Sequence, residues 1–324
     1  MFFKNLKKRI AVGLSAALLL AAAAGCGSEG GGGGAANTFI NIGTGGTAGT
    51  YYPIGGAMAD ILNKAIPNMN ASAQSTGASV ANINMLQSGD IDLAIIQNDI
   101  AFYAQNGSEM FEGKAYKGLR AIASLYPETC QIVTLADSGI NSIADLKGKR
   151  VAVGATGSSV VANARQILEA YGLTYDDIQV QYLSFGEASN ALRDGNIDAA
   201  FVTAGFPTAA LQDISSQNQI RLLAVDADKA DAMIAKYPYY TKTVIPANTY
   251  AGVTTDTPAV SVMAMLVATD KLDKSLSRDI TKALFENLDA LQAAHTAAKA
   301  ISKEHAKDGL SIEMSEGAAE YLSK

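Results

Sequence analysis

The sequence has few of the side chains on which many enzymes and metal proteins depend, with only two cysteines and two histidines. Cys26 lies in an N-terminal leader, so Cys130 has no intramolecular disulfide partner and is expected to be a small buried residue. His295 and His305 both fall near the C-terminus, and their spacing matches no zinc-binding pattern. No pair of carboxylates and no Ser–His arrangement stands out. We therefore expect a chain that is not an enzyme and that uses no cofactor and no metal.

Positive charge is also scarce after the first nine residues. The net charge is −6 at pH 7 and the isoelectric point is about 5.0. Proteins that bind nucleic acids present basic patches, so we expect no nucleic-acid partner. Hydrophobic residues make up 48% of the chain, which excludes a disordered protein. Residues 38–324 are enough for one large or two medium domains with a buried core.

The first 37 residues have the pattern of an export leader followed by a tether. Residues 1–9 carry four positive charges, and Ile10 to Ala24 form an apolar run shorter than the roughly 20 residues of a membrane-spanning helix. Ala23-Ala24-Gly25-Cys26 is similar to a bacterial lipobox, which implies a signal peptide at 1–25 and a lipid on Cys26. An ordinary signal peptide cleaved near Ala24 is the alternative. The glycine-rich residues 26–37 predict a flexible spacer that holds the protein at the membrane.

The same order of elements occurs twice between residues 38 and 225. Each copy reads as a strand, a glycine loop, a helix, a second strand, a helix and a third strand. The spacing from Gly43 to Gly77 in the first copy is close to that from Gly154 to Gly186 in the second. Strands alternating with helices indicate βαβ units and a parallel sheet. The sequence therefore predicts two α/β lobes.

The remaining segments give the predicted domain boundaries. Strands at 119–124 and 131–136 flank Tyr126-Pro127-Glu128, which we interpret as a crossover between the lobes. Residues 276–300 have the apolar periodicity of one long amphipathic helix. We assign 38–127 and 226–324 to the first lobe, and 128–225 to the second.

Candidate ligand-binding residues lie at the ends of the predicted strands. In open parallel sheets ligands bind beyond the carboxyl ends of the strands, and two facing lobes would form a cleft there. Glycine loops that open helices offer free N–H groups suited to carboxylates. Tight turns and simple helix caps are the alternative roles of the loops, with Ser158, Ser159, Asn98 or Asp99 as a cap, and Tyr51 and Tyr52 could instead be core residues. The candidates are Thr44, Gly45, Gly46 and Thr47, Gly157 to Ser159, Gln97 to Asp99, Thr203 to Pro207, and Tyr51 and Tyr52.

Several motifs resemble the TAXI family, the solute receptors associated with TRAP transporters. They are NIGTGGTAGTYYPIGGAMADILN (41–63), TGASVANINMLQSGDIDLAIIQND (76–99), SLYPE (124–128), GSSVVANARQILEAYGL (157–173), AFVTAGFP (200–207) and SEGAAEYL (315–322). The resemblance implies a two-lobed type II periplasmic-binding-protein fold with a cleft between the lobes. It places the ligand contacts on Thr44, Gly45, Gly46, Thr47, Tyr51, Tyr52, Thr76, Ser79, Gln97, Asp99, Ser158, Ser159, Thr203 and Gly205.

The resemblance also implies a solute and a partner. The solute would be glutamate, glutamine or a related five-carbon acid, and the partner a fused TRAP-type membrane permease driven by an ion gradient. Ala155 and Thr156 depart from the family pattern in the second loop, which leaves the solute open. We expect a monomer outside the cytoplasmic membrane. A binding protein that serves a surface sensor or an ATP-driven importer is the alternative.

A dinucleotide-binding enzyme is a weaker alternative. Gly43, Gly45 and Ala48 satisfy the G-x-G-x-x-A spacing after a strand. That fold needs an acidic residue at the end of the second strand to hold a ribose, and Ser75-Thr76-Gly77 lies there instead.

Overall fold

The structure, a computed structural model, describes residues 37–324. The predicted signal peptide, Cys26 and the glycine-rich stretch up to Ala36 lie outside the described residues. Within residues 37–324 no helix has both the length and the apolar character needed to cross a membrane.

The predicted order of strands and helices is present in both copies. The strands are β1 (Thr38–Gly43), β2 (Met69–Gln74), β3 (Leu93–Gln97), β4 (Leu119–Leu135), β5 (Arg150–Ala152), β6 (Gln179–Gln181), β7 (Ala199–Ala204), β8 (Ile220–Leu222), β9 (Thr241–Ile245) and β10 (Thr257–Thr269). The α-helices are α1 (Tyr51–Ala65), α2 (Ser79–Ser88), α3 (Asn98–Asn106), α4 (Val160–Ala170), α5 (Phe185–Arg193), α6 (Ala209–Gln217), α7 (Ala227–Lys236), α8 (Lys274–Phe285), α9 (Leu288–Ala294) and α10 (Glu316–Leu322). Short 3-10 helices are η1 (Glu109–Phe111), η2 (Ile143–Leu146), η3 (Tyr175–Asp177) and η4 (Thr296–Ala300).

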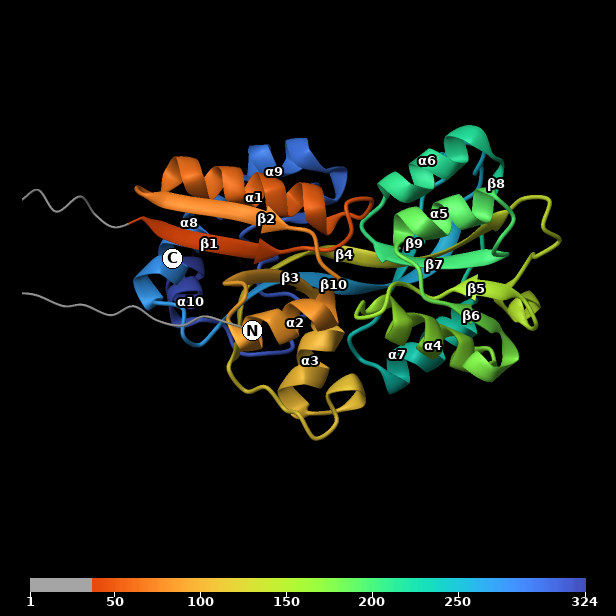
Figure 1. The fold of residues 1–324 in the computed structure, drawn as a ribbon, viewed down its shortest axis with the longest axis horizontal. Helices are drawn as coiled ribbons and strands as arrows, with labels where there is room; N and C mark the ends of the chain where they lie inside the picture. Colours follow the sequence, from red (N-terminus) through yellow and green to blue (C-terminus); the bar gives the residue numbers. More distant parts are fainter. Residues whose placement is uncertain (1–36) are drawn as a thin grey trace, which may run out of the picture. The chain divides into compact units, whose positions relative to one another are not determined.

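The strands form one sheet in the order β2-β1-β3-β10-β4-β7-β5-β6, with β8 beside β4 and β9 beside β10. The pairs of β1 with β2 and β3, and of β5 with β6 and β7, are parallel, as the repeat predicts. The long strands β4 and β10 are antiparallel to each other and to their neighbours. Both run lengthwise from the group of strands around β1 to β3 to the group around β5 to β7 (Figure 1). They join a first lobe, around β1 to β3, to a second lobe, around β5 to β7.

Helices cover both faces of the sheet in each lobe, so the strands are apolar on both sides. In β3, Leu93 and Ile95 pack beneath α1, α8 and α9, whereas Ala94 and Ile96 pack against α2 and α3. In the second lobe, Phe201 of β7 packs on the side of α4 and α7, and its neighbour Val202 on the side of α5 and α6. This alternation with period two fixes the register of the strands.

The predicted break between strands 119–124 and 131–136 is wrong, because β4 continues through it. Proline lacks the N–H that a central strand donates, and Pro127 would ordinarily end such a strand. In the structure Pro127 lies opposite Met263, next to an irregularity in the pairing between Met263 and Met265. Proline is tolerated at such bulges, and the strand can therefore pass from one lobe to the other.

The single long helix predicted at 276–300 is also wrong. It is divided into α8, α9 and η4, with breaks at Asn287 and His295. The amide of Asn287 donates to the carbonyl of Ala283 (2.8 Å), and Nδ1 of His295 accepts from the N–H of Ala297 (3.1 Å). Both side chains thus form hydrogen bonds with backbone groups that, in a continuous helix, would be paired with other backbone groups. The predicted apolar face is nevertheless present, since Ile280, Leu284 and Leu291 are buried in the first lobe.

Residues 226–262, predicted in the first lobe, pack instead with the second. Met233 of α7 and Val260 share a core with Ile132 and Phe201, and α7 packs on α4. Strand β10 pairs with β3 only between Ala264 and Ala268, so the chain returns to the first lobe near Met263. The second crossover is thus a strand beside β4, and not the loop after β8.

Candidate ligand-binding site

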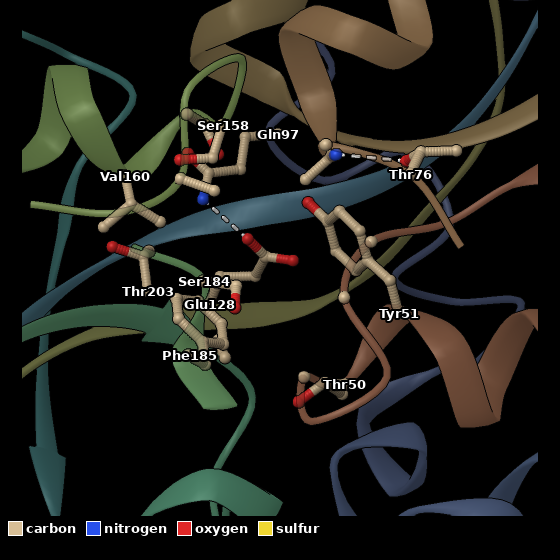
Figure 2. Close-up of a pocket in the computed structure, with 18 residues that line it drawn as sticks. Thr50, Tyr51, Thr76, Gln97, Glu128, Ser158, Val160, Ser184, Phe185 and Thr203 are labelled. Carbon is tan, nitrogen blue, oxygen red and sulfur yellow. Dashed lines mark hydrogen bonds between the residues drawn. The ribbon is translucent and has the colours of Figure 1, made fainter. Parts of the chain in front are cut away.

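A small cavity of about 80 Å³ lies between the two lobes, next to the point where β4 passes from one to the other (Figure 2). Its walls come from the carboxyl ends of strands and from the loops that open helices, which is where open α/β sheets bind ligands. Residues that line it from the first lobe and the crossover are Gly45, Gly46, Gly49, Thr50, Tyr51, Thr76, Gly77, Ala78, Gln97 and Glu128. Those from the second lobe are Ala155, Ser158, Ser159, Val160, Ser184, Phe185, Thr203 and Ala204.

The glycine loop after β1 brings the backbone to the cavity. A Cβ on Gly43 would lie 2.4 Å from Ile91 Cδ1 and 2.9 Å from Asn82 Oδ1, so a larger residue at the end of the strand would displace these side chains. Gly45 and Gly46 then line the cavity, and Tyr51 begins α1. Thr44, in contrast, is fully buried and donates its hydroxyl to the carbonyl of Gln74 (2.6 Å). The loop therefore offers glycine backbone and the ring of Tyr51 to a ligand, and Thr44 secures it to β2.

The second glycine loop precedes α4 and uses left-handed backbone at Gly154 and Gly157, with φ of 99° and 87°. Such values favour glycine, which has no Cβ to clash. Ser158 follows with its Oγ buried and without a hydrogen-bond partner in the described part of the chain. Neither Ser158 nor Ser159 makes a side-chain capping bond at α4, so the simple N-cap role is not what the geometry shows. Ser158 is available to a ligand.

Buried polar atoms without partners gather at this cavity. Besides Ser158 Oγ, they include the hydroxyl of Tyr51, Oε1 of Gln97 and Oε1 of Glu128. Gln97 ends β3, and its Nε2 donates to Oε2 of Glu128 (2.7 Å). Figure 2 shows the Tyr51 hydroxyl and the Glu128 carboxylate pointing into the same space. Buried polar groups usually have partners, so such a cluster indicates a ligand site.

The charge of the site is set by Glu128. Lysine and arginine are absent from the lining residues, and Glu128 is 1% exposed. Burial raises the pKa of Glu128 to about 8. Burial, and then the nearby charge of Glu128, raise the pKa of Tyr51 well above its ordinary value. Among residues 37–324 no group of three His, Cys, Asp or Glu could hold a metal ion.

Eight of the predicted site residues line the cavity and six do not. Those that line it are Gly45, Gly46, Tyr51, Thr76, Gln97, Ser158, Ser159 and Thr203. Thr47 and Tyr52 are exposed to solvent outside it. Thr44, Ser79, Asp99 and Gly205 are buried behind it and bond to protein groups or pack closely.

Three of those residues join the lobes to each other. Ser79 donates to Oγ of Ser159 (3.3 Å), and Asp99 accepts from the amide of Asn163 (3.1 Å). The carbonyl of Gly205 accepts from the hydroxyl of Thr50 (2.9 Å). In addition, the carbonyl of Gly157 accepts from two N–H groups at the start of α2. The lobes are thus in contact beside the cavity.

Glu128, Ser184 and Phe185 were missed as site residues. Glu128 was interpreted only as part of the crossover, although an acid between apolar strand segments is a signal in itself. Ser184 and Phe185 open α5, and by the pairing of Gly77 with Gly186 they correspond to Ser75 and Thr76 in the first copy. Because Thr76 was a candidate, applying the repeat to the site as well as to the fold would have found Phe185.

Solved structures share this architecture. The alkanesulfonate-binding protein SsuA from Xanthomonas axonopodis pv. citri, bound to MOPS, aligns with a TM-score of 0.53 and 18% identity, over 89% of this chain and 84% of that one. A putative L-cystine ABC transporter from Listeria monocytogenes aligns with a TM-score of 0.50 and 18% identity, over 83% and 98%. The predicted fold class, a two-lobed α/β fold of the periplasmic-binding-protein type, is confirmed.

The chain belongs to the NMT1-like family, which it matches over residues 42–323. A curated relative, the putative aliphatic sulfonates-binding protein of Escherichia coli (strain K12), is 30% identical over 152 residues. That match covers 47% of this chain and 45% of the relative, about half the length of each. The proteins named in these comparisons are binding or transport proteins, and none is named as an enzyme.

Proposed function

We propose that this chain is the extracytoplasmic solute-binding component of a membrane transporter, and not an enzyme. The observation that carries the proposal is the cavity between two lobes, into which both lobes direct buried polar atoms without partners. A binding protein needs such a site because contacts from both lobes stabilise the closed form around the solute. The names of the relatives support the same role.

The proposed solute is a small acid. The glycine loops before α1 and α4 present N–H groups at helix N-termini, which favour carboxylate, sulfonate or phosphonate groups. Glutamate, glutamine or a related five-carbon acid remains our proposal, and it rests on the TAXI-like motifs. A sulfonate is the second candidate, because SsuA from X. axonopodis pv. citri was solved with MOPS.

The proposed partner is a fused TRAP-type permease, again on the basis of those motifs. An ATP-driven importer is the second candidate, since the L. monocytogenes protein is named as an ABC transporter. In either case the closed, loaded form would dock on the permease, which opens the lobes and takes the solute. The lipid on Cys26 would keep the protein beside its permease. A gene for a large multi-spanning permease next to that of this chain would favour the TRAP assignment.

A thermal-shift screen of the full chain tests the solute class. A ligand that binds only the folded state at 100 times its Kd stabilises by about 2.7 kcal/mol, which is several degrees in Tm. We expect amino acids, dicarboxylates or sulfonates to raise Tm, and neutral sugars to leave it unchanged. If a sugar or a peptide raised Tm and no small acid did, the proposed solute class would be wrong.

A further inference from the structure

When Glu128 is ionised, Gln97 and Glu128 present two acceptor atoms to the cavity and no donor. The amide of Gln97 donates through Nε2 to Oε2 of Glu128, which leaves Oε1 of each side chain buried and without a partner. The reverse orientation of the amide would place its oxygen against Oε2 of Glu128, which is unfavourable once that carboxyl is ionised. Each unsatisfied buried acceptor costs free energy, so these two oxygens favour donors from a solute, beside the Tyr51 hydroxyl that points into the same space.

The protein itself supplies no positive charge to Glu128. The titratable groups that interact with it are Tyr51 of α1, Asp99 of α3, and Tyr126 and Cys130 of β4. All are neutral or acidic, and all are buried. A buried carboxylate without a cation is costly, and a positively charged group on the solute would remove that cost.

We propose that Gln97 and Glu128 bind an ammonium group of the solute, so that the solute is a small zwitterion and not a simple dicarboxylate, sulfonate or phosphonate. The inference rests on the proposed function and narrows its solute class. An ammonium group carries three N–H donors, of which two satisfy the free oxygens of Gln97 and Glu128. The acid group of the same solute is then left for the N–H groups of the glycine loops and the hydroxyl of Ser158. A carboxylate or sulfonate placed against Glu128 would offer it neither a proton donor nor a counter-charge.

Matched solute pairs test this inference on the full chain. Each pair differs only in an amine: L-glutamate and glutarate, L-aspartate and succinate, taurine and ethanesulfonate. We expect calorimetry to show binding at least tenfold tighter for the amine-bearing member of whichever pair binds. The variant Glu128→Gln, which keeps the shape but not the charge, should reduce that preference to less than threefold. Glu112→Gln, at an exposed position away from the cavity, is the matched control and should retain the preference.

The pH profile of the unaltered protein gives a second test that needs no variant. Burial raises the pKa of Glu128 to about 8, so binding an ammonium below that pH requires the carboxyl to lose its proton. Affinity for the amine-bearing solute should therefore rise between pH 6 and 8, by up to about tenfold per pH unit. A neutral Glu128 that donates to an acid group of the solute would give the opposite slope above pH 8.

The outcomes separate the two proposals. If none of the six compounds binds, the small-acid function fails and the inference fails with it. If one pair binds without preference for the amine, or if Glu128→Gln keeps the preference, only the inference is overturned. A falling affinity between pH 6 and 8 would overturn it as well.

Discussion

At the scale of a single residue, a substitution of Ser158 should change the affinity for the solute and leave the stability of the fold nearly unchanged. The Oγ of Ser158 has no partner in the described part of the chain, so removing it should cost the folded protein little. If the hydroxyl bonds to the acid group of the solute, Ser158→Ala should weaken binding by roughly 5- to 30-fold, or about 1–2 kcal/mol. Calorimetry measures the affinity, and Tm should change by no more than about 2 °C.

Thr47→Ala is the matched control for Ser158→Ala. Thr47 lies in the other glycine loop but is exposed and outside the cavity. We expect its affinity and Tm to match those of the unaltered protein. Equal weakening by both substitutions would mean that the loops act together, and the assignment of Ser158 as a contact would have to be withdrawn.

The sequence predicted the loops of the site better than the direction of individual side chains. Strand ends and glycine loops follow from patterns of composition, and eight of the fourteen candidates line the cavity. Whether Thr44 faces a ligand or the carbonyl of Gln74 depends on a single torsion angle set by packing against β2. Glu128 was missed because its burial, which results from two lobes that meet around it, was not inferred from the apolar segments on either side.

At the scale of elements, the end of β7 comes very close to η4 of the other lobe. A Cβ on Gly205 would lie 2.5 Å from Cβ of Ala297, and 3.2 Å from side-chain atoms of Thr50 and Tyr126. A solute-bound form that keeps this close approach has no room for the added methyl group, whereas a form in which β7 and η4 are apart would have. Gly205→Ala should therefore weaken solute binding at least fivefold, which is about 1 kcal/mol. The loss in the free energy of unfolding, measured as a fall in Tm, should be smaller than this. Calorimetry and thermal unfolding measure the two effects.

Gly56→Ala is the control for that substitution. Gly56 lies within α1, and a Cβ there would meet nothing within 4 Å. Alanine is the better helix former by roughly 0.8–1 kcal/mol, so Tm should stay equal or rise while affinity is unchanged. An unaltered affinity in Gly205→Ala would show that the lobes close without this close approach.

The elements that the sequence predicted correctly are those with local signals. Gly89 ends α2 in the left-handed conformation, as its position after an apolar helix predicts. Two of the failures concern contacts distant in sequence, and the third is a local bond from a side chain to the backbone. Pro127 lies within a strand because of its position opposite β10, and Asn287 breaks a helix that its periodicity favoured. The segment 226–262 joins the second lobe because α7 packs on α4, which the repeat alone did not indicate.

At the scale of the whole molecule, two buried acids make folding depend on pH. Burial raises the pKa of Asp99 to about 7 and that of Glu128 to about 8, from ordinary values of 3.8 and 4.5. Between the ordinary pKa and the raised pKa of each acid, the folded state keeps a proton that the unfolded state has lost. The contribution of both groups to the free energy of unfolding therefore falls as pH rises from about 4 to about 8, by at most about 1.4 kcal/mol per pH unit for each group.

Urea denaturation at pH 5, 6, 7 and 8 isolates these contributions when each variant is compared with the unaltered protein. Glu128→Gln and Asp99→Asn should each lose stability less steeply with rising pH, because a neutral amide has no proton to keep. Glu112→Gln, whose acid is exposed, should follow the unaltered protein. Parallel curves for all four proteins would mean that both acids are ionised in the folded state at neutral pH. Glu128 would then need a counter-charge from within the protein, and the case for an ammonium on the solute would lose its electrostatic support.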